Sequence, residues 1–245
     1  MSADVARGSD AVALCQRLVK LQSDTIGDVL DEMGYRHQIL SADIRPISPE
    51  MKVAGPAFTI KGQTATHSTV QAEGGAPKPG YEMFRRMYTG CVAVMETGGH
   101  TVGAPWGENS ALSAKVRGCA GMVVDGGTRD GRELMAMAFP TFAKFISAAR
   151  VEGRWTHLAF DVPITMPGQT CKEVIVNPGD FVLADFDGVV VIPRRLAEEV
   201  IAAAEQVQRV EERIREELTA GVDREEVYRR HPRYAHIRKP SNRTA

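Results

Sequence analysis

The strongest constraint on the fold lies between residues 91 and 150, where short β-branched runs alternate with segments that suit helices. Val92 to Met95 and Gly121 to Asp125 are short runs rich in β-branched and other apolar residues, which is typical of buried strands. Between them, Asn109 to Arg117 is rich in alanine, serine and leucine and is long enough for a helix. This order of strand, helix, strand and helix predicts an α/β unit.

Further elements are predicted on either side of this unit. Strand signals begin at the stretch MKVAGPAFTIKG, and helices are expected before it at Ala11 to Leu21 and at Ser23 to Met33. The second helix starts with Ser-Asp-Thr, a plausible N-cap, and Gly34 is expected to stop it. Later runs of the same β-branched kind predict three more strands: Glu173–Val176, Phe181–Ala184 and Val189–Ile192.

The clearest helical pattern follows Pro193. Apolar residues recur every three or four positions from Leu196 to Leu218, with glutamate and arginine on the other face, and Gly221 is expected to end the helix. A helix of about 23 residues would be roughly 35 Å long, more than a compact domain of this size needs. We therefore expect this helix to pack against another subunit.

Composition narrows the possible classes of protein. The chain has 245 residues, 43% of them hydrophobic, and a formal net charge of −1, which argues against a protein-wide nucleic-acid surface. We expect no signal peptide, because the first ten residues lack an apolar core, and no membrane span, because no apolar run approaches the required ~18 residues. The four cysteines form no CxxC motif, so the expectation is a reduced, cytoplasmic protein.

The end of the chain is basic. From Arg229 to Ala245 it holds six basic and no acidic residues. A nucleic-acid-binding arm is one interpretation of this tail. We favour the other, an extended tail wrapped on a neighbouring subunit.

The stretch VVDGGTRDGREL, residues 123–134, places an Arg-Asp pair where a strand ends and a helix begins. Gly126 and Gly127 let the backbone turn sharply and approach a ligand. Arg129 can grip a carboxylate through two parallel hydrogen bonds, and Asp130 suits a hard cation such as Mg²⁺. Taken alone, the pair also fits a solvated turn with charges at a helix start.

A second loop-to-helix junction lies upstream, at Gly107 and Glu108, and Gly107 is predicted to belong to the substrate-binding site. One helix and one strand fit the interval to Arg129, so both junctions can face one pocket at the same end of the sheet. The predicted pocket combines two carboxylates for a metal and its waters, an arginine for a carboxylate, and free amides for the same anion: Glu108, Asp130, Arg129 and the backbone of Asn109 and Ser110.

These segments, together with GCAGMVVDGGTRD and VIVNPGDFVLADFDGVVVIP, closely resemble the RraA-like family over roughly residues 25 to 218. That family includes divalent-metal-dependent 4-hydroxy-4-methyl-2-oxoglutarate/4-carboxy-4-hydroxy-2-oxoadipate aldolases, which also decarboxylate oxaloacetate. It also includes non-enzymatic regulators of ribonuclease E. The resemblance implies one domain over residues 1–245, with a three-layer α/β sandwich of the swivelling type and a long C-terminal helix. It also implies homotrimers or homohexamers.

In the aldolase branch, the resemblance implies that Arg129 binds the pyruvoyl part of the substrate and that Asp130 ligates Mg²⁺ or Mn²⁺. Glu108 would sit near the metal through water. An acidic residue from the long C-terminal helix of a neighbouring subunit completes such sites. Glu211 is the candidate here, with Glu205 and Glu212 as alternatives because the helix register cannot be fixed from sequence.

The implied function is a carbon–carbon lyase that acts on a small 2-oxo acid, by retro-aldol cleavage to pyruvate, by decarboxylation of oxaloacetate, or by both. The ribonuclease regulators lack the metal-binding aspartate, so Asp130 favours the enzymatic branch. The alternative is a non-enzymatic regulator that binds a ribonuclease or another protein. Neither membrane nor nucleic acid is an expected partner.

Two departures from the family pattern leave the substrate open. The aldolases usually have two leucines after the acidic residue, where this chain has Asn109 and Ser110. The preceding loop, METGGHTVGAPWGEN, is also unusually rich in polar and aromatic groups. Several side chains therefore allow either a role in substrate binding or a structural one: Glu96, His100 and Trp106 in this loop, and His67 before it.

Overall fold

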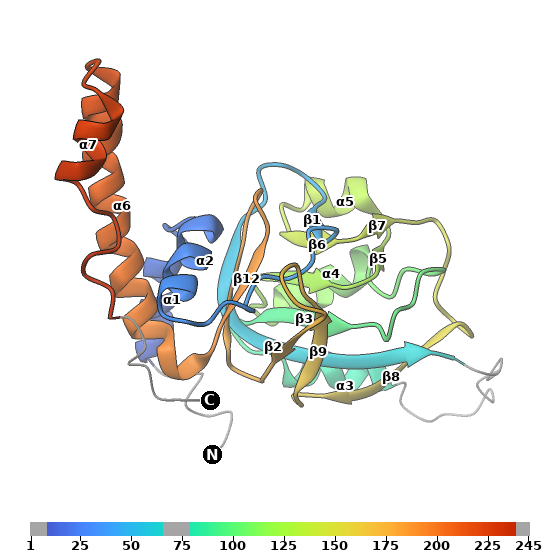
Figure 1. Ribbon diagram of the computed structural model, residues 1–245. Helices are drawn as coiled ribbons and strands as arrows, with labels where there is room; N and C mark the ends of the chain where they lie inside the picture. The colour runs from blue at the N-terminus through green and yellow to red at the C-terminus, as the bar shows by residue number, and fades with distance from the viewer. Residues whose placement is uncertain (1–8, 66–78, 239–245) are drawn as a thin grey trace.

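The computed structural model describes residues 9–65 and 79–238. Within them, a mixed eight-stranded sheet forms the centre of the molecule (Figure 1). His67 and the end of the basic tail, residues 239–245, lie outside the described residues. Among the helices of the described part, none combines the length and the apolar character that a bilayer span requires.

One long strand, β2, connects the two halves of the sheet. The strands are β1 (Arg45–Pro46), β2 (Val53–Thr64), β3 (Val92–Glu96), β4 (Gly121–Val124), β6 (Thr141–Ala143), β8 (Trp155–Phe160), β11 (Phe181–Ala184) and β12 (Val189–Ile192). The start of β2 pairs antiparallel with β11, its middle pairs parallel with β3, and its end pairs antiparallel with β8. The order through the sheet is β1-β6-β4-β3-β2-β11-β12.

The predicted α/β unit is confirmed. β3 is followed by α4 (Glu108–Val116), then by β4 and by α5 (Gly131–Ala136). β3 and β4 pair in parallel, as do β4 and β6, because each crossover carries a helix that returns the chain to the same edge. The strands predicted at residues 173–176, 181–184 and 189–192 coincide with β10, β11 and β12.

Alternation along the strands divides the interior into layers. In β3, Val92 and Val94 face a hairpin made of β9 (Ile164–Pro167) and β10 (Glu173–Val176). Ala93 and Met95 point the other way, into a core covered by α4, α5 and a further helix, α3 (Pro79–Arg86). Helices, sheet and hairpin make up the three layers of the predicted α/β sandwich, which is confirmed.

A third apolar cluster lies against β11 and β12. It is formed by α1 (Ser9–Leu18), α2 (Ser23–Glu32) and α6 (Ala197–Thr219). The predicted N-cap of α2 is wrong, because Ser23 is the first helical residue and does not cap the helix with its side chain. Instead the Asp185 carboxylate, in the turn after β11, accepts hydrogen bonds from the Ser23 amide at 2.8 Å and from its hydroxyl at 2.5 Å.

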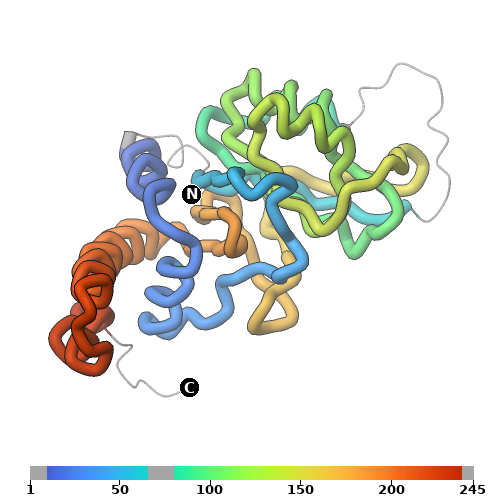
Figure 2. Tube along the Cα trace, turned by 90° about the horizontal axis from the view of Figure 1, so that it is seen from above, coloured from blue at the N-terminus to red at the C-terminus, as the bar shows by residue number. Residues whose placement is uncertain are grey.

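The predicted C-terminal helix is confirmed as α6, and its apolar stripe is covered by its own chain. The first half packs on α1 and α2. The second half is covered by α7 (Arg224–Arg230). Ile214 of α6 and Val227 of α7 are both buried at this contact. Together α6 and α7 extend away from the sheet as a helical arm (Figures 1 and 2). The apolar stripe therefore gives no reason of its own to expect a second subunit on this helix.

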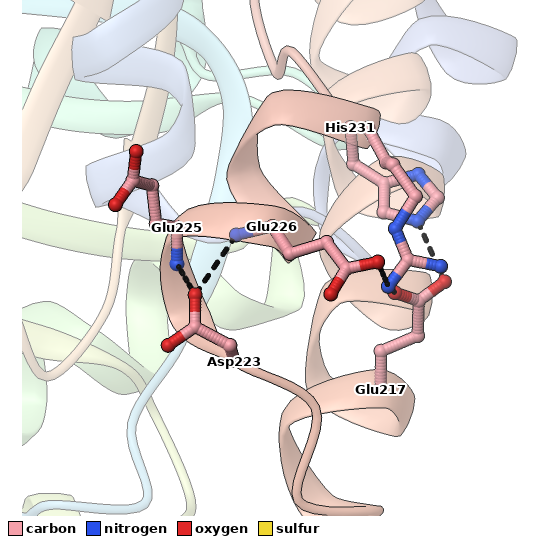
Figure 3. Close-up of polar contacts among 6 residues, drawn as sticks. Glu217, Asp223, Glu225, Glu226 and His231 are labelled. Carbon is pink, nitrogen blue, oxygen red and sulfur yellow. Dashed lines mark hydrogen bonds and ion pairs between the residues drawn. The ribbon is translucent and has the colours of Figure 1, made fainter.

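Polar contacts hold α7 against the end of α6. The Glu217 carboxylate accepts from His231 at 2.9 Å and pairs with Arg230 at 3.0 Å, while Asp223 caps α7 through the amides of Glu225 and Glu226 (Figure 3). The expected extended tail is wrong for residues 229–238. Its start belongs to α7, and further along Tyr234 donates to Asp28 of α2 and Ile237 is buried in the cluster with α6, all within the same chain.

We expect His157 on β8 to make the stability of this fold sensitive to acid. Its ring packs on Trp155 and Phe160, and among the described residues its Nε2 atom is buried without a partner. Burial lowers the pKa of His157 to about 4. The unfolded chain, with a histidine pKa near ~6.5, binds more protons between these values, so stability should fall as pH falls through this window.

We expect His157→Phe to remove that dependence, because phenylalanine keeps the ring contacts and cannot be protonated. Between pH 7 and pH 4.5, the wild type should lose about 2 kcal/mol more unfolding free energy than the variant. Urea titrations at several pH values measure this difference, with His37→Gln as the exposed-histidine control. Identical pH profiles for wild type and His157→Phe would contradict the assignment.

Candidate functional site

The two loop-to-helix junctions predicted to share a pocket lie side by side. After β4 the chain turns into a short strand, β5 (Gly127–Thr128), which pairs in parallel with β7 (Phe145–Ile146). On its other side Thr128 pairs in parallel with Trp106, and the Arg129 amide donates to the Trp106 carbonyl at 2.9 Å. The start of α4 is thereby placed next to the Arg129–Asp130 pair.

Asp130 connects the two junctions through its carboxylate. One oxygen, Oδ2, accepts a hydrogen bond from the Glu108 amide at 3.1 Å, and the other, Oδ1, accepts from Arg129 Nε at 3.2 Å. The side chain therefore caps α4 from across the loops and makes no cap on its own helix, α5. Asp130 has φ 56° and ψ 42°, a left-handed conformation that aspartate tolerates better than most residues.

Gly107 is required for this close approach because of space. Its backbone is extended, with φ −161°, which any residue can adopt. A Cβ atom there would lie 2.6 Å from Asp130 Oδ2 and 2.7 Å from Arg129 Cγ. The glycine predicted to bind substrate thus lets the Arg-Asp pair sit against the start of α4.

The charged groups of the site remain open to solvent. The side chains of Arg129 and Asp130 are 41% and 33% exposed, and Glu108 and Asn109 are also exposed, while Ser110 is half-buried. Arg129 uses its Nε atom on Asp130, and its two terminal nitrogens have no partner among the described residues. That guanidinium edge can accept a carboxylate in the bidentate manner.

The donor set fits a hard cation that keeps most of its waters. A carboxylate offers about four acceptor positions, and Asp130 uses two of them. Within residues 9–65 and 79–238 there is no group of three or more His, Cys, Asp or Glu side chains that could enclose a metal. One or two carboxylates plus water is the coordination typical of Mg²⁺, and it does not suit a closed zinc site.

The acidic candidates on α6 do not reach this site within their own chain. Glu211 pairs with Arg233 at 3.1 Å and Glu205 pairs with Arg17 at 2.8 Å, whereas Glu212 is exposed and has no partner among the described residues. The arm that carries them lies at the opposite end of the sheet from α5 (Figures 1 and 2). Any contribution from α6 must therefore come from another copy of the chain.

The polar loop before α4 has structural roles. Glu96 accepts from the Thr165 amide of β9 at 3.1 Å. His100 is 3% exposed, and the Gly103 amide donates to its Nε2 atom at 2.8 Å, so Nδ1 carries the proton and donates to Thr64 at 3.0 Å. Burial, with a smaller contribution from the charge of Arg154, lowers the pKa of His100 and keeps the ring neutral.

Sequence reasoning missed two features of the site. Trp106 is fully buried, and its carbonyl is the acceptor that joins the two loops. Asp125, at the end of β4, is 6% exposed and accepts from the Thr97 amide at 2.6 Å, and burial raises the pKa of this carboxyl. Neither role has a signal in the sequence, since both depend on which segment lies opposite.

A curled mixed α/β sheet with a long C-terminal helix defines the structural class, and comparison with known proteins identifies the family. The family model described as RraA-like, Aldolase/RraA, matches residues 23–191. The chain therefore belongs to the RraA-like family. The protein DlpA of Legionella pneumophila is 30% identical over 85% of this chain, which spans only 32% of the length of DlpA.

Two further matches carry names from the two branches of the family. A Halalkalibacterium halodurans protein, named provisionally as a 4-hydroxy-4-methyl-2-oxoglutarate aldolase, is 32% identical over 75% of this chain and 78% of its own length. The solved structure of Streptomyces coelicolor RraAS2, described as an unusual member of the RNase ES inhibitor RraA family, has a TM-score of 0.70 at 26% identity. The match covers 82% of this chain and 95% of that one.

We expect Gly107→Ala to separate the two loops, because the added methyl group overlaps both Asp130 and Arg129. Overpacking of this kind should cost about 1–3 kcal/mol of unfolding free energy, measured by urea denaturation. Gly27→Ala is the control, since its Cβ would meet only the tip of Ile39, at 3.1 Å, in a helix that favours alanine. Equal stability of Gly107→Ala and wild type would show that the loops are free to move apart.

Proposed function

We propose that this protein is a divalent-metal-dependent carbon–carbon lyase that acts on a small 2-oxo acid. The reaction is retro-aldol cleavage to pyruvate, decarboxylation of oxaloacetate, or both. The observation that carries the proposal is the solvent-accessible Arg129–Asp130 pair, held against the first turn of α4 by a hydrogen bond at 3.1 Å. The aldolase name of a relative at 32% identity supports it.

Each group of the site has a role in binding. The free edge of the Arg129 guanidinium binds the carboxylate of the 2-oxo acid, and the amides of Asn109 and Ser110, in the first turn of α4, face the same anion. Asp130 would hold Mg²⁺ or Mn²⁺, and Glu108 would contact the water around the cation. When bound, the cation supplies Lewis-acid stabilisation of negative charge on the 2-oxo group.

Both reactions break the bond between C3, the carbon next to the 2-oxo group, and C4. The electron pair of that bond stays on C3 as the enolate of pyruvate. C4 leaves as carbon dioxide in the decarboxylation or, after its hydroxyl group loses a proton, as a carbonyl group in the retro-aldol cleavage. Arg129 contributes a positive charge that is in place before negative charge develops, so no reorganisation is needed at that moment. Glu108 is exposed and within reach of solvent, so its carboxylate can orient the water that takes or returns a proton.

The alternative is a non-enzymatic regulator that binds a ribonuclease or another protein. The likeness to RraAS2, with its TM-score of 0.70, favours that function. Asp130 argues for the lyase, because the family resemblance implies that the ribonuclease regulators lack this aspartate, and its remaining acceptor positions suit a cation. Release of pyruvate separates the two functions directly.

The site also supports an assembly of several subunits. The inner face of α4 is buried through Ala111 and Ala114, and its outer face is also apolar, with Leu112 and Val116 50% and 77% exposed. With Tyr81 and Phe84 of α3 these side chains line a groove, bordered by Arg85 and Arg117. A second copy covers this groove in the proposed homotrimer or homohexamer and brings an acidic residue of its α6 toward Asp130.

Of the α6 candidates, Glu212 has no partner among the described residues, while Glu211 would have to share its charge with Arg233. Glu211 remains the first candidate from the family resemblance. The two can be separated by alanine variants assayed for activity after the oligomeric state has been verified.

We expect pyruvate to be released from one or more members of a panel of 2-oxo acids, including oxaloacetate and 4-hydroxy-4-methyl-2-oxoglutarate, only with Mg²⁺ or Mn²⁺ present. Asp130→Asn should lower kcat/KM about a thousandfold, partly recovered at high metal concentration, because the ligand loses its charge. Its unfolding free energy should change by about 1 kcal/mol or less.

Asp161→Asn is the matched control, since Asp161 also has a left-handed backbone, with φ 59°, and lies in the turn after β8. It should keep full activity. Turnover that persists in excess chelator, or an Asp130→Asn variant as active as wild type, would contradict the proposed metal site. The absence of any pyruvate release over the panel would favour the regulator.

We expect Val116→Glu to dissociate the assembly into smaller species, because it places a carboxylate in the apolar groove. Light scattering during gel filtration measures the change in mass. Val12→Glu, at a residue of α1 that is 54% exposed, is the control and should keep the wild-type mass. If Val116→Glu has the wild-type mass, the subunit contact lies elsewhere.

A further inference from the structure

The two loops of the candidate site are joined at a single carbonyl group. The oxygen of Trp106 accepts one hydrogen bond from the Arg129 amide at 2.9 Å and a second from the Thr128 hydroxyl at 3.2 Å. Thr128 is fully buried, so its hydroxyl has no competing water. Thr128 therefore connects the Arg129–Asp130 pair to Trp106, the residue before Gly107.

The Trp106 ring anchors this connection in the core. The side chain is 1% exposed, stacks on Phe139 with ring centroids 6.2 Å apart, and lies 6.3 Å from the ring of Phe84. Phe84 belongs to α3, and Phe139 lies between α5 and β6. The carbonyl that receives both hydrogen bonds is consequently held by packing on both sides, and it provides a fixed reference for the Arg129–Asp130 loop.

A third hydrogen bond joins the same two loops on the other side of Gly107, where the Glu108 amide donates to the Asp130 carboxylate at 3.1 Å. The segments 106–108 and 128–130 are thus joined on both sides of Gly107. We infer that Thr128 is a positioning residue, whose hydroxyl acts through the Trp106 carbonyl to hold Arg129 and Asp130 at the start of α4. This role rests on the proposed function, in which those two groups bind the substrate and the cation.

Removal of the hydroxyl would leave the loops attached but less well oriented. The Arg129 amide would still donate to the Trp106 carbonyl, so the contact would survive with one hydrogen bond in place of two. Small displacements of charged groups weaken binding strongly, because productive geometry has a tolerance well below about 1 Å. The effect should therefore fall on ligand binding more than on folding.

The test compares Thr128→Val, which keeps the shape, with Thr128→Ser, which keeps the hydroxyl. Thr59→Val is the control, because Thr59 is fully buried and its hydroxyl donates to the Val162 carbonyl at 2.6 Å, away from the site. Mn²⁺ binding without substrate is measured by calorimetry. Hydrogen exchange is followed in segments 103–110 and 127–134.

We expect Thr128→Val to bind Mn²⁺ about tenfold more weakly, the equivalent of one hydrogen bond, with faster exchange in both segments. Thr128→Ser should stay within about twofold of wild type. Thr59→Val should lose comparable stability with unchanged Mn²⁺ affinity and unchanged exchange in these segments. Thr128→Ala, also without a hydroxyl but smaller, takes the place of Thr128→Val if the latter does not fold.

Two results would overturn the inference while leaving the proposed function intact. One is Mn²⁺ affinity in Thr128→Val equal to that of wild type, and the other is an equal loss in Thr128→Ser, which would assign the effect to packing of the methyl group. A wild-type protein that binds no Mn²⁺ would instead remove the proposed function, and the positioning role would fall with it.

Discussion

The pairing of β2 with three partners is the constraint on which the rest of this structure depends. Twelve residues in one strand hydrogen-bond in turn to β11, β3 and β8, so the two halves of the sheet share a single backbone. Its alternating side chains contribute to the clusters on both faces. Because β3 pairs with this strand and β4 pairs with β3, the loops that leave their ends, and with them the candidate site, take their positions from it.

Much of this fold could be predicted from local patterns, and the failures have a common physical cause. β10, β11 and β12 match the predicted bounds to the residue, because each β-branched run ends where a turn residue follows: Asn177, Asp185 and Pro193. The cap of α2 was missed because its acceptor, Asp185, is distant in sequence. The helix α6 was predicted, but an apolar stripe does not reveal what covers it. Here α1 and α2 cover its first half and α7 covers its second half, all within the same chain.

The candidate site likewise combines features that local sequence patterns predict with features that depend on distant segments. The strand–helix order brought the two junctions together as predicted, and Arg129 lies next to the start of α4. The sequence could not show that the Trp106 carbonyl joins them, since any residue has a carbonyl. Nor could it show that His100 is neutral and bonded to Thr64 and Gly103, because histidine in a polar loop suits binding and structure equally. Whether a neighbouring α6 completes the site stays a prediction.

The double engagement of the Asp130 carboxylate has an evolutionary consequence. One oxygen caps α4 and the other receives Arg129, so the same side chain serves the local architecture and the candidate chemistry. If the proposed catalytic role were lost in a descendant, the aspartate would still serve α4, since without it the Glu108 amide would lose its acceptor. Divergence toward a non-catalytic role would first require a substitute cap, such as asparagine or serine. Such a substitute would identify relatives that keep the cap on α4 but have lost the proposed metal ligand.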